Sequence, residues 1–186
     1  MNIEIESSYR KNDIGKTIYE TVLKYKPKIA IDFGVLYGYS TVCMAKALKE
    51  IGEGKIIVYD LWNKYPYRHA VKKDFIKNMK KYNLLDVIEI KQLDFFEWLK
   101  NPVYFDFMHL DISNDGYIIE YVYNKLRSFI EDGSVIIFEG GTIERDQEEW
   151  MIKYEKTPIY PLKDKLNYEI INSNWPGLSL IQRQEL

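Results

Sequence analysis

The sequence places carboxylate side chains at the ends of successive apolar segments: Asp32, Asp60, Asp94, Asp111 and Glu139. Carboxylates accept hydrogen bonds from sugar hydroxyls and amines, take protons from hydroxyl nucleophiles and bind hard cations such as Mg²⁺. In doubly wound sheets the ligand lies beyond the carboxyl ends of the parallel strands. If the apolar segments are such strands, we expect these carboxylates to meet at one ligand-binding edge.

The first of these segments is followed by a glycine turn. Residues 29–33 are short, apolar and β-branched, which predicts a buried strand that stops at Gly34. Gly38 and Ser40 then precede a helical apolar stripe over residues 41–51. Glycine lets the backbone approach a ligand closely, and a helix N-terminus presents unpaired N–H groups. This combination is typical of sites for nucleotide-like ligands.

Strand and helix patterns alternate along the rest of the chain. Strands are predicted at 29–33, 56–60, 87–94, 105–111 and 134–139, and helices at 13–26, 41–51, 70–82, 95–99 and 117–132. Alternation of this kind favours an α/β, doubly wound, mostly parallel sheet with right-handed crossovers. A charged helix over 145–155 and two further strand-like runs, 168–173 and 178–183, follow. Asn-Trp-Pro-Gly joins these runs, which predicts a C-terminal antiparallel hairpin.

Two motifs resemble a known family. DFGVLYGYST at 32–41 and VYDLW at 58–62 resemble the first two motifs of class I S-adenosylmethionine-dependent methyltransferases. Their form is similar to that of the small O-methyltransferase-like and cephalosporin-hydroxylase-like branches, and the order of elements extends the resemblance from about residue 13 to residue 184. The resemblance implies a Rossmann-like methyltransferase fold with a seven-stranded sheet. We expect a single domain over 1–186, with 1–12 as a peripheral segment.

The resemblance also implies a binding site for the donor S-adenosylmethionine. Its expected residues are Asp32, Gly34, Tyr37, Gly38, Ser40, Asp60, Leu61, Trp62, Asp94, Phe95 and Asp111. Asp60 stands about 20 residues beyond Gly38, the spacing of an acid that accepts hydrogen bonds from ribose hydroxyls. Asp94 is expected at the adenine amine. Its alternative role is to cap the helix 95–99, in which case backbone groups of Leu93 or Phe95 would contact the adenine.

The resemblance places Asp111 near the transferred methyl group. Related branches often carry Asp-Gly-x-His-x-Tyr here, whereas this chain keeps Asp111 and Tyr117 without the His. Metal-dependent relatives carry Asp-Asn or Asp-Asp where this chain has Glu139. Asp111 and Glu139 are therefore the candidate catalytic bases, with His69 as a further candidate. We predict no metal site because the usual ligand set is incomplete, although Asp111 and Glu139 could still hold Mg²⁺.

Two other segments carry polar side chains of interest. Arg145, Asp146 and Trp150 follow the fifth strand and are candidates for the acceptor site, although a solvated helix start explains them nearly as well. His109 lies inside the fourth predicted strand, where a packed histidine is more common than a catalytic one.

Composition narrows the classes of partner and location. A net charge of −2 and a pI near 5.8 argue against a nucleic-acid partner. The single cysteine, Cys43, excludes an intramolecular disulfide and agrees with a reducing compartment. No apolar stretch approaches the roughly 20 residues that span a bilayer, and residues 1–11 lack a signal-peptide pattern. We expect a cytoplasmic protein without a membrane partner. The sequence leaves open whether the protein forms a homo-oligomer.

These observations favour a methyltransferase that acts on a small molecule, at a hydroxyl oxygen. One alternative is a non-catalytic S-adenosylmethionine-binding or accessory protein on the same fold, which the missing His and the Glu139-Gly-Gly variant motivate. Another is an NAD-dependent oxidoreductase. We rank it last because the spacing of Gly34 and Gly38 lacks the Gly-x-Gly-x-x-Gly form that binds a pyrophosphate.

Overall fold

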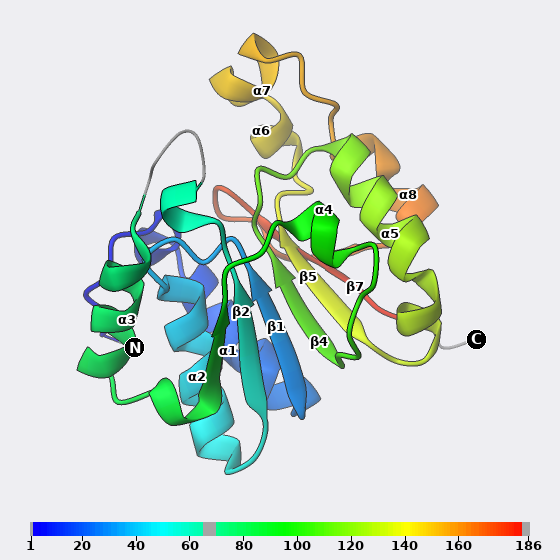
Figure 1. Cartoon of the computed structure of the whole chain (residues 1–186). Coiled ribbons are helices and arrows are strands. Elements are labelled where there is room, and N and C mark those ends of the chain that lie inside the picture. Colours follow the sequence, from blue (N-terminus) through cyan, green and yellow to red (C-terminus); the bar gives the residue numbers. More distant parts are fainter. Residues whose placement is uncertain (1, 65–69, 184–186) are drawn as a thin grey trace.

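A mixed β-sheet forms the centre of the computed structural model, which describes residues 2–64 and 70–183. Its seven strands within these residues follow the order β3-β2-β1-β4-β5-β7-β6 (Figure 1). The strands are β1 (Ile29–Phe33), β2 (Lys55–Tyr59), β3 (Ile88–Lys91), β4 (Phe107–Leu110), β5 (Val135–Glu139), β6 (Glu169–Asn172) and β7 (Leu178–Ile181). β1 to β5 are parallel, whereas β7 runs antiparallel between β5 and β6. The predicted α/β fold with its C-terminal hairpin is confirmed.

Helices cover both faces of this sheet. They are α1 (Ile14–Tyr25), α2 (Tyr39–Ile51), α3 (Lys72–Lys81), α4 (Phe95–Trp98), α5 (Gly116–Glu131), α6 (Ile143–Asp146), α7 (Glu149–Lys153) and α8 (Lys163–Leu166). Short 3₁₀ turns, η1 (Ser8–Lys11), η2 (Trp62–Lys64), η3 (Leu85–Val87) and η4 (Tyr160–Leu162), complete the described elements. One apolar core packs α1, α2 and α3 on the sheet, and a second packs α4 and α5 on its other face.

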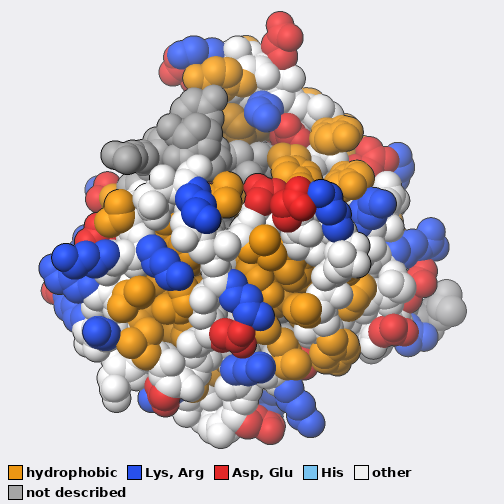
Figure 2. All heavy atoms as spheres, in the orientation of Figure 1, with side chains coloured by type: hydrophobic (Ala, Val, Ile, Leu, Met, Phe, Trp, Pro, Cys, Tyr) orange, Lys and Arg blue, Asp and Glu red, His pale blue; other side chains and the backbone are white. Residues whose placement is uncertain are grey.

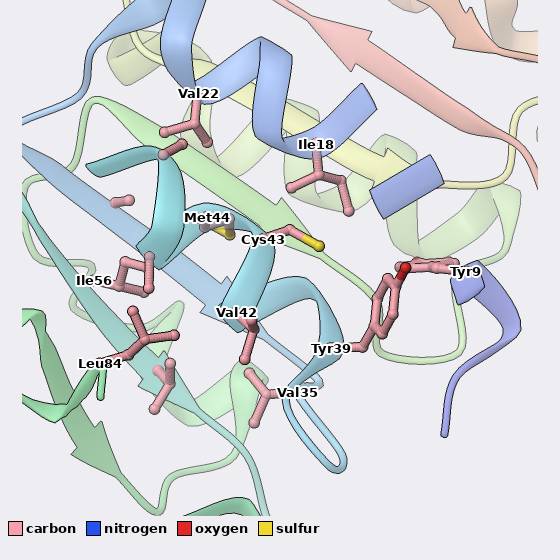
Figure 3. Packing of buried hydrophobic residues seen from close by; sticks show 14 of the residues in the cluster. Tyr9, Ile18, Val22, Val35, Tyr39, Val42, Cys43, Met44, Ile56 and Leu84 are labelled. Carbon is pink, nitrogen blue, oxygen red and sulfur yellow. The ribbon is translucent and has the colours of Figure 1, made fainter. Parts of the chain in front are cut away.

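Alternation along the strands explains the two cores. In β1, Ala30 is buried in the first core, and Ile31 and Phe33 are buried in the second. Figure 3 shows Ile18 and Val22 of α1 facing Cys43 and Met44 of α2 within the first core. The opposite face of the molecule, which carries α4 and α5, exposes hydrophobic side chains among Lys and Arg residues (Figure 2).

The N-terminal segment is not peripheral. Ile3, Ile5 and Tyr9 are each at most 3% exposed and join the first core, where Figure 3 shows Tyr9 in the same layer as α2. The segment packs because burial of these apolar side chains offsets the entropy lost when the chain is ordered.

Two short helices replace the single charged helix expected over 145–155. α6 begins at the cap Thr142, whose Oγ1 accepts a hydrogen bond from the Arg145 backbone N–H at 3.2 Å. The chain then becomes extended at Glu148 (ψ 141°) before α7 begins. The expectation of a solvated helix start is also wrong for Arg145, which is only 3% exposed.

The expected loop after the second strand is described only in part, because residues 65–69 lie outside the described residues. Across the described ranges, no helix has both the length and the apolar character that a membrane crossing requires.

Gly34 directly follows β1 and lies against the residue that follows β4, and alanine cannot replace it without a shift of the backbone. Its φ is +77°, and a Cβ there would lie 1.8 Å from the carbonyl oxygen of Asp111. Gly52 has a similar φ of +86°, but a Cβ added there would meet no atom within 4 Å. We predict that Gly52→Ala meets only the left-handed backbone penalty of roughly 1–2 kcal/mol, and that Gly34→Ala lowers the free energy of unfolding by about 1–3 kcal/mol more.

Urea unfolding of both variants checks this prediction, because a change in midpoint at an unchanged slope reports stability. Equal losses for the two variants would contradict it.

Candidate active site

A cavity of about 730 Å³ lies beyond the carboxyl ends of the five parallel strands. Each of these strands is followed by residues that line it, so the cavity crosses the sheet edge from β3 to β5. Its lining includes Gly34, Leu36, Asp60, Leu61, Trp62, Leu93, Asp94, Phe95, Phe96, Asp111, Ile112, Ser113, Glu139, Arg145 and Trp150. Ser8, Ile118, Lys156, Trp175 and Pro176 also contribute. The expected meeting of the carboxylates at one edge thus occurs for all of them except Asp32.

Asp60 is held in place by backbone N–H groups. Its Oδ2 accepts a hydrogen bond from Leu36 N at 3.0 Å, and its Oδ1 accepts one from Trp62 N at 2.6 Å. Burial raises the pKa of Asp60, and the hydrogen bonds from the backbone oppose this rise. A carboxylate has about four acceptor positions, so these two bonds leave Asp60 able to accept further hydrogen bonds from a ligand.

Asp94 caps α4 and lines the cavity at the same time. Its Oδ1 accepts hydrogen bonds from Phe96 N at 2.8 Å and Glu97 N at 3.3 Å. The capping role is therefore observed, while the contact with an adenine amine stays a prediction. Phe95 beside it is buried against Phe33, with ring centroids 4.8 Å apart.

Asp111 and Glu139 form an acidic pair at the ends of β4 and β5. Burial, followed by the negative charge of Glu139, raises the pKa of Asp111 to about 8. The hydrogen bond that the Tyr9 hydroxyl donates to Asp111 Oδ2, at 2.8 Å, opposes this rise. Glu139 Oε1 accepts a hydrogen bond from Arg145 Nε at 2.6 Å. Asp111 therefore loses its proton closer to neutral pH than an ordinary carboxyl group does, which suits a general base.

Asp32 lies behind the cavity wall. Its side chain is fully buried and accepts hydrogen bonds from Ser40 Oγ at 3.1 Å and Thr41 Oγ1 at 2.6 Å. Its other oxygen lies 2.7 Å from Nδ1 of His109 on the neighbouring strand. This geometry therefore does not support the expected contact of the Asp32 and Ser40 side chains with S-adenosylmethionine. Side chains alternate along a strand, and the side chain of residue 32 points toward α2. Tyr37 and Gly38 are likewise not part of the lining.

His109 is the packed histidine that the sequence indicates. It is fully buried, and its ring meets that of Tyr9 edge-on at 6.0 Å between centroids. Burial lowers the pKa of His109, but the hydrogen bond to Asp32 and the charge of Asp32 raise it above its ordinary value. The other candidate base, His69, lies outside the described residues.

Several residues that line the cavity or contact its side chains escape sequence reasoning. Ser8 and Tyr9 come from a segment without any motif, and the Tyr9 contact to Asp111 joins positions 102 residues apart. Trp175 and Pro176 arrive from the β6–β7 connection, for which the sequence indicates only a turn. The sequence around Arg145 likewise does not indicate that this side chain is buried.

The structure describes no cluster of three or more His, Cys, Asp or Glu side chains placed to hold a metal ion. One oxygen of Asp111 faces Tyr9 and one oxygen of Glu139 faces Arg145. Independence from a metal stays a prediction.

A family model described as a methyltransferase domain matches residues 31–139, more than half of the chain. The chain belongs to this methyltransferase-domain family. The match runs from β1 to the end of β5 and so contains the strand ends that carry Asp60, Asp94, Asp111 and Glu139. The resemblance to methyltransferases drawn from the sequence is confirmed.

Solved structures share the fold of this methyltransferase domain. A putative O-methyltransferase from Klebsiella pneumoniae is 13% identical, with a TM-score of 0.65 over 98% of this chain and 84% of that one. An O-methyltransferase from Bacillus cereus in complex with SAH is 16% identical, with a TM-score of 0.64 over 98% and 84%. A SAH-bound methyltransferase from Podospora anserina is 15% identical, with a TM-score of 0.65 over 97% and 80%. No curated protein sequence matches the chain.

The raised pKa of Asp111 makes the stability of the methyltransferase domain depend on pH. The pKa rises from an ordinary 3.8 to about 8 on folding. Between these values the folded protein keeps a proton that the unfolded chain has lost, so the free energy of unfolding falls as pH rises from about 4 to 8. We predict a smaller fall for Asp111→Asn, measured by urea unfolding at a series of pH values.

Tyr9→Phe provides the matched comparison, because it keeps the ring and removes only the hydroxyl. Loss of this hydrogen bond moves the pKa of Asp111 upward, so the fall extends to higher pH. Identical pH profiles for the wild type and Asp111→Asn would contradict the assignment.

Proposed function

We propose that this protein is an S-adenosylmethionine-dependent methyltransferase that methylates a hydroxyl oxygen of a small-molecule acceptor. The observation that carries the proposal is Asp60 at the end of β2, fixed by two backbone N–H groups and facing a cavity that also contains the Asp111 and Glu139 carboxylates. Membership of the methyltransferase-domain family supports it. So do neighbours of the same fold whose structures contain SAM or SAH.

The residues of the cavity fit such a donor. A volume of about 730 Å³ lies within the usual range for small-molecule sites, roughly 300–1,000 Å³. Asp60 keeps acceptor capacity for ribose hydroxyls, and Leu61 and Trp62 follow it in the cavity lining. Asp94 and Phe95 at the β3 end offer a carboxylate beside an aromatic surface, which suits an adenine. Gly34 brings backbone to the cavity between these residues and Asp111.

S-adenosylmethionine, when bound, supplies a methyl group on a positively charged sulfur, so that an O–C bond forms as the S–C bond breaks. The protein has to align the acceptor, exclude water and accept the hydroxyl proton. We assign this proton to the carboxylates of Asp111 and Glu139. Tyr9 holds one oxygen of Asp111, which fixes the orientation of the carboxyl group.

The remaining expectations extend this proposal. Acceptors that carry a suitable hydroxyl group include a sugar, a phenol or another small hydroxylated metabolite. Catalysis without Mg²⁺ follows if the acidic pair itself takes the proton. Action as one domain over 1–186, a cytoplasmic location and the absence of nucleic-acid and membrane partners stay predictions. The oligomeric state stays open.

Donor binding tests the role of Asp60. We predict that Asp60→Asn weakens binding of S-adenosylhomocysteine at least about tenfold, because a charged acceptor of ribose hydroxyls is lost. Asp106→Asn is the matched control: Asp106 also accepts two backbone hydrogen bonds, from Lys28 N at 2.9 Å and Ile29 N at 3.0 Å, but does not line the cavity. Calorimetric titration measures both variants. Binding of NAD in place of S-adenosylhomocysteine would overturn the proposal in favour of an oxidoreductase.

Methyl transfer tests the role of the acidic pair. With labelled S-adenosylmethionine and a panel of sugars, phenols and hydroxy acids, we predict transfer that persists in EDTA and rises as pH passes through about 8, where Asp111 loses its proton. Asp111→Asn should abolish this rise. Donor binding without transfer to any acceptor would instead support the non-catalytic alternative.

A further inference from the structure

Arg145 is a buried cation with an unused donor. Its side chain is 3% exposed, Nε donates to Glu139 Oε1 at 2.6 Å, and Nη2 donates to the Asn114 carbonyl oxygen at 3.5 Å. Nη1 is buried and has no hydrogen-bond partner among the described residues. The guanidinium carbon lies 4.4 Å from the ring centroid of Trp150. Both side chains line the cavity.

An unpaired donor on a buried guanidinium is unfavourable. A charged group that is taken from water without a full set of hydrogen bonds loses solvation that the protein does not replace. Arginine usually binds carboxylates through two parallel N–H bonds, but Glu139 engages only Nε. A ligand oxygen at Nη1 would complete the set.

The position of Arg145 assigns this ligand to one half of the cavity. Asp60 and Asp94 lie at the ends of β2 and β3, whereas Arg145 follows β5 and is separated from them by β1 and β4 in the sheet order. The donor nucleoside belongs to the β2–β3 half, and Arg145 therefore belongs to the acceptor half. Trp150, Trp175 and Ile118 line the cavity as well and provide apolar surface for the body of an acceptor.

We infer that the acceptor is a hydroxylated carboxylic acid whose carboxylate binds the Arg145 guanidinium, while its hydroxyl meets the Asp111 and Glu139 pair. This inference rests on the proposed methyl transfer and narrows its substrate class. Arg145 then sets specificity, since a neutral analogue leaves Nη1 unpaired. Lys156 is the other cation among the described residues of the lining, but its Nζ already lies 3.3 Å from Asp115 Oδ2.

Benzoate and benzamide are matched probes for this site, because they share shape and differ in charge. We expect the wild type to bind benzoate at least tenfold more tightly than benzamide, with and without S-adenosylhomocysteine, by calorimetry. Arg145→Lys keeps the positive charge toward Glu139 but loses the planar fork, so the preference should fall severalfold. Arg145→Gln should abolish it. Lys156→Gln should keep the preference within twofold.

Tryptophan fluorescence gives a second readout that does not depend on activity. Benzoate should change the emission of the wild type, and Trp150→Phe should remove most of this change. Circular dichroism shows whether each variant is folded.

Two results would overturn the inference. Equal binding of benzoate and benzamide to the wild type would mean that water satisfies Nη1. A tenfold loss of S-adenosylhomocysteine affinity in Arg145→Lys, with the benzoate preference intact, would assign the guanidinium to the donor carboxylate. Failure of the wild type to bind S-adenosylhomocysteine would instead refute the proposed function. The benzoate titrations in the absence of S-adenosylhomocysteine still test the anion site on its own.

Discussion

A buried contact between Asp32 and His109 joins the two central strands, and the ligand edge depends on it. Asp32 Oδ1 lies 2.7 Å from His109 Nδ1, and neither side chain is exposed. The second oxygen of Asp32 accepts the hydroxyl hydrogen bonds of Ser40 and Thr41 at the start of α2. One carboxylate thus ties β1, β4 and α2 together. It fixes the turn between them, and with it the position of Gly34 against the Asp111 backbone.

The same region concentrates charge that folding alone would not favour. When both are ionised, Asp111 and Glu139 repel each other at the ends of adjacent strands, which is one cause of the raised pKa of Asp111. Tyr9 and Arg145 each donate a hydrogen bond to one member of the pair. Replacement of such groups by apolar side chains of similar volume is often neutral or stabilising. A cluster of perturbed and partly unsatisfied groups is more typical of a functional site than of a structural one.

Local patterns predict much of this arrangement. Hydrophobic periodicity places the five parallel strands and the hairpin, and a residue just after each strand then has to lie at the ligand edge. This holds for Asp60 and Asp111, which directly follow β2 and β4. Asp94 also reaches the edge, although β3 already ends at Lys91. It fails for Asp32 because that residue lies inside the strand, where side chains alternate between faces. Periodicity also cannot locate the break at Glu148, where the backbone turns extended between two short charged helices.

The missed parts of the site depend on contacts between distant segments. Tyr9 reaches Asp111 only after the sheet has formed, and no spacing rule relates the two positions. Sequence patterns also cannot predict the burial of Arg145, because its neighbours in the sequence are charged. Composition favours solvent exposure there, whereas the side chain turns inward to the Glu139 carboxylate.

The cavity wall combines an early segment of the chain with a late one. Asn12 donates a hydrogen bond to the Trp175 carbonyl oxygen, and Asn174 Nδ2 donates one to the Asn12 carbonyl oxygen at 3.1 Å. Ser8 and Trp175 therefore border the cavity from opposite ends of the described sequence. During synthesis on the ribosome, the central strands can pair long before residue 175 emerges from the exit tunnel. The pocket gains its final wall only then, so a nascent chain that does not yet include residue 175 has a cavity that is open on that side.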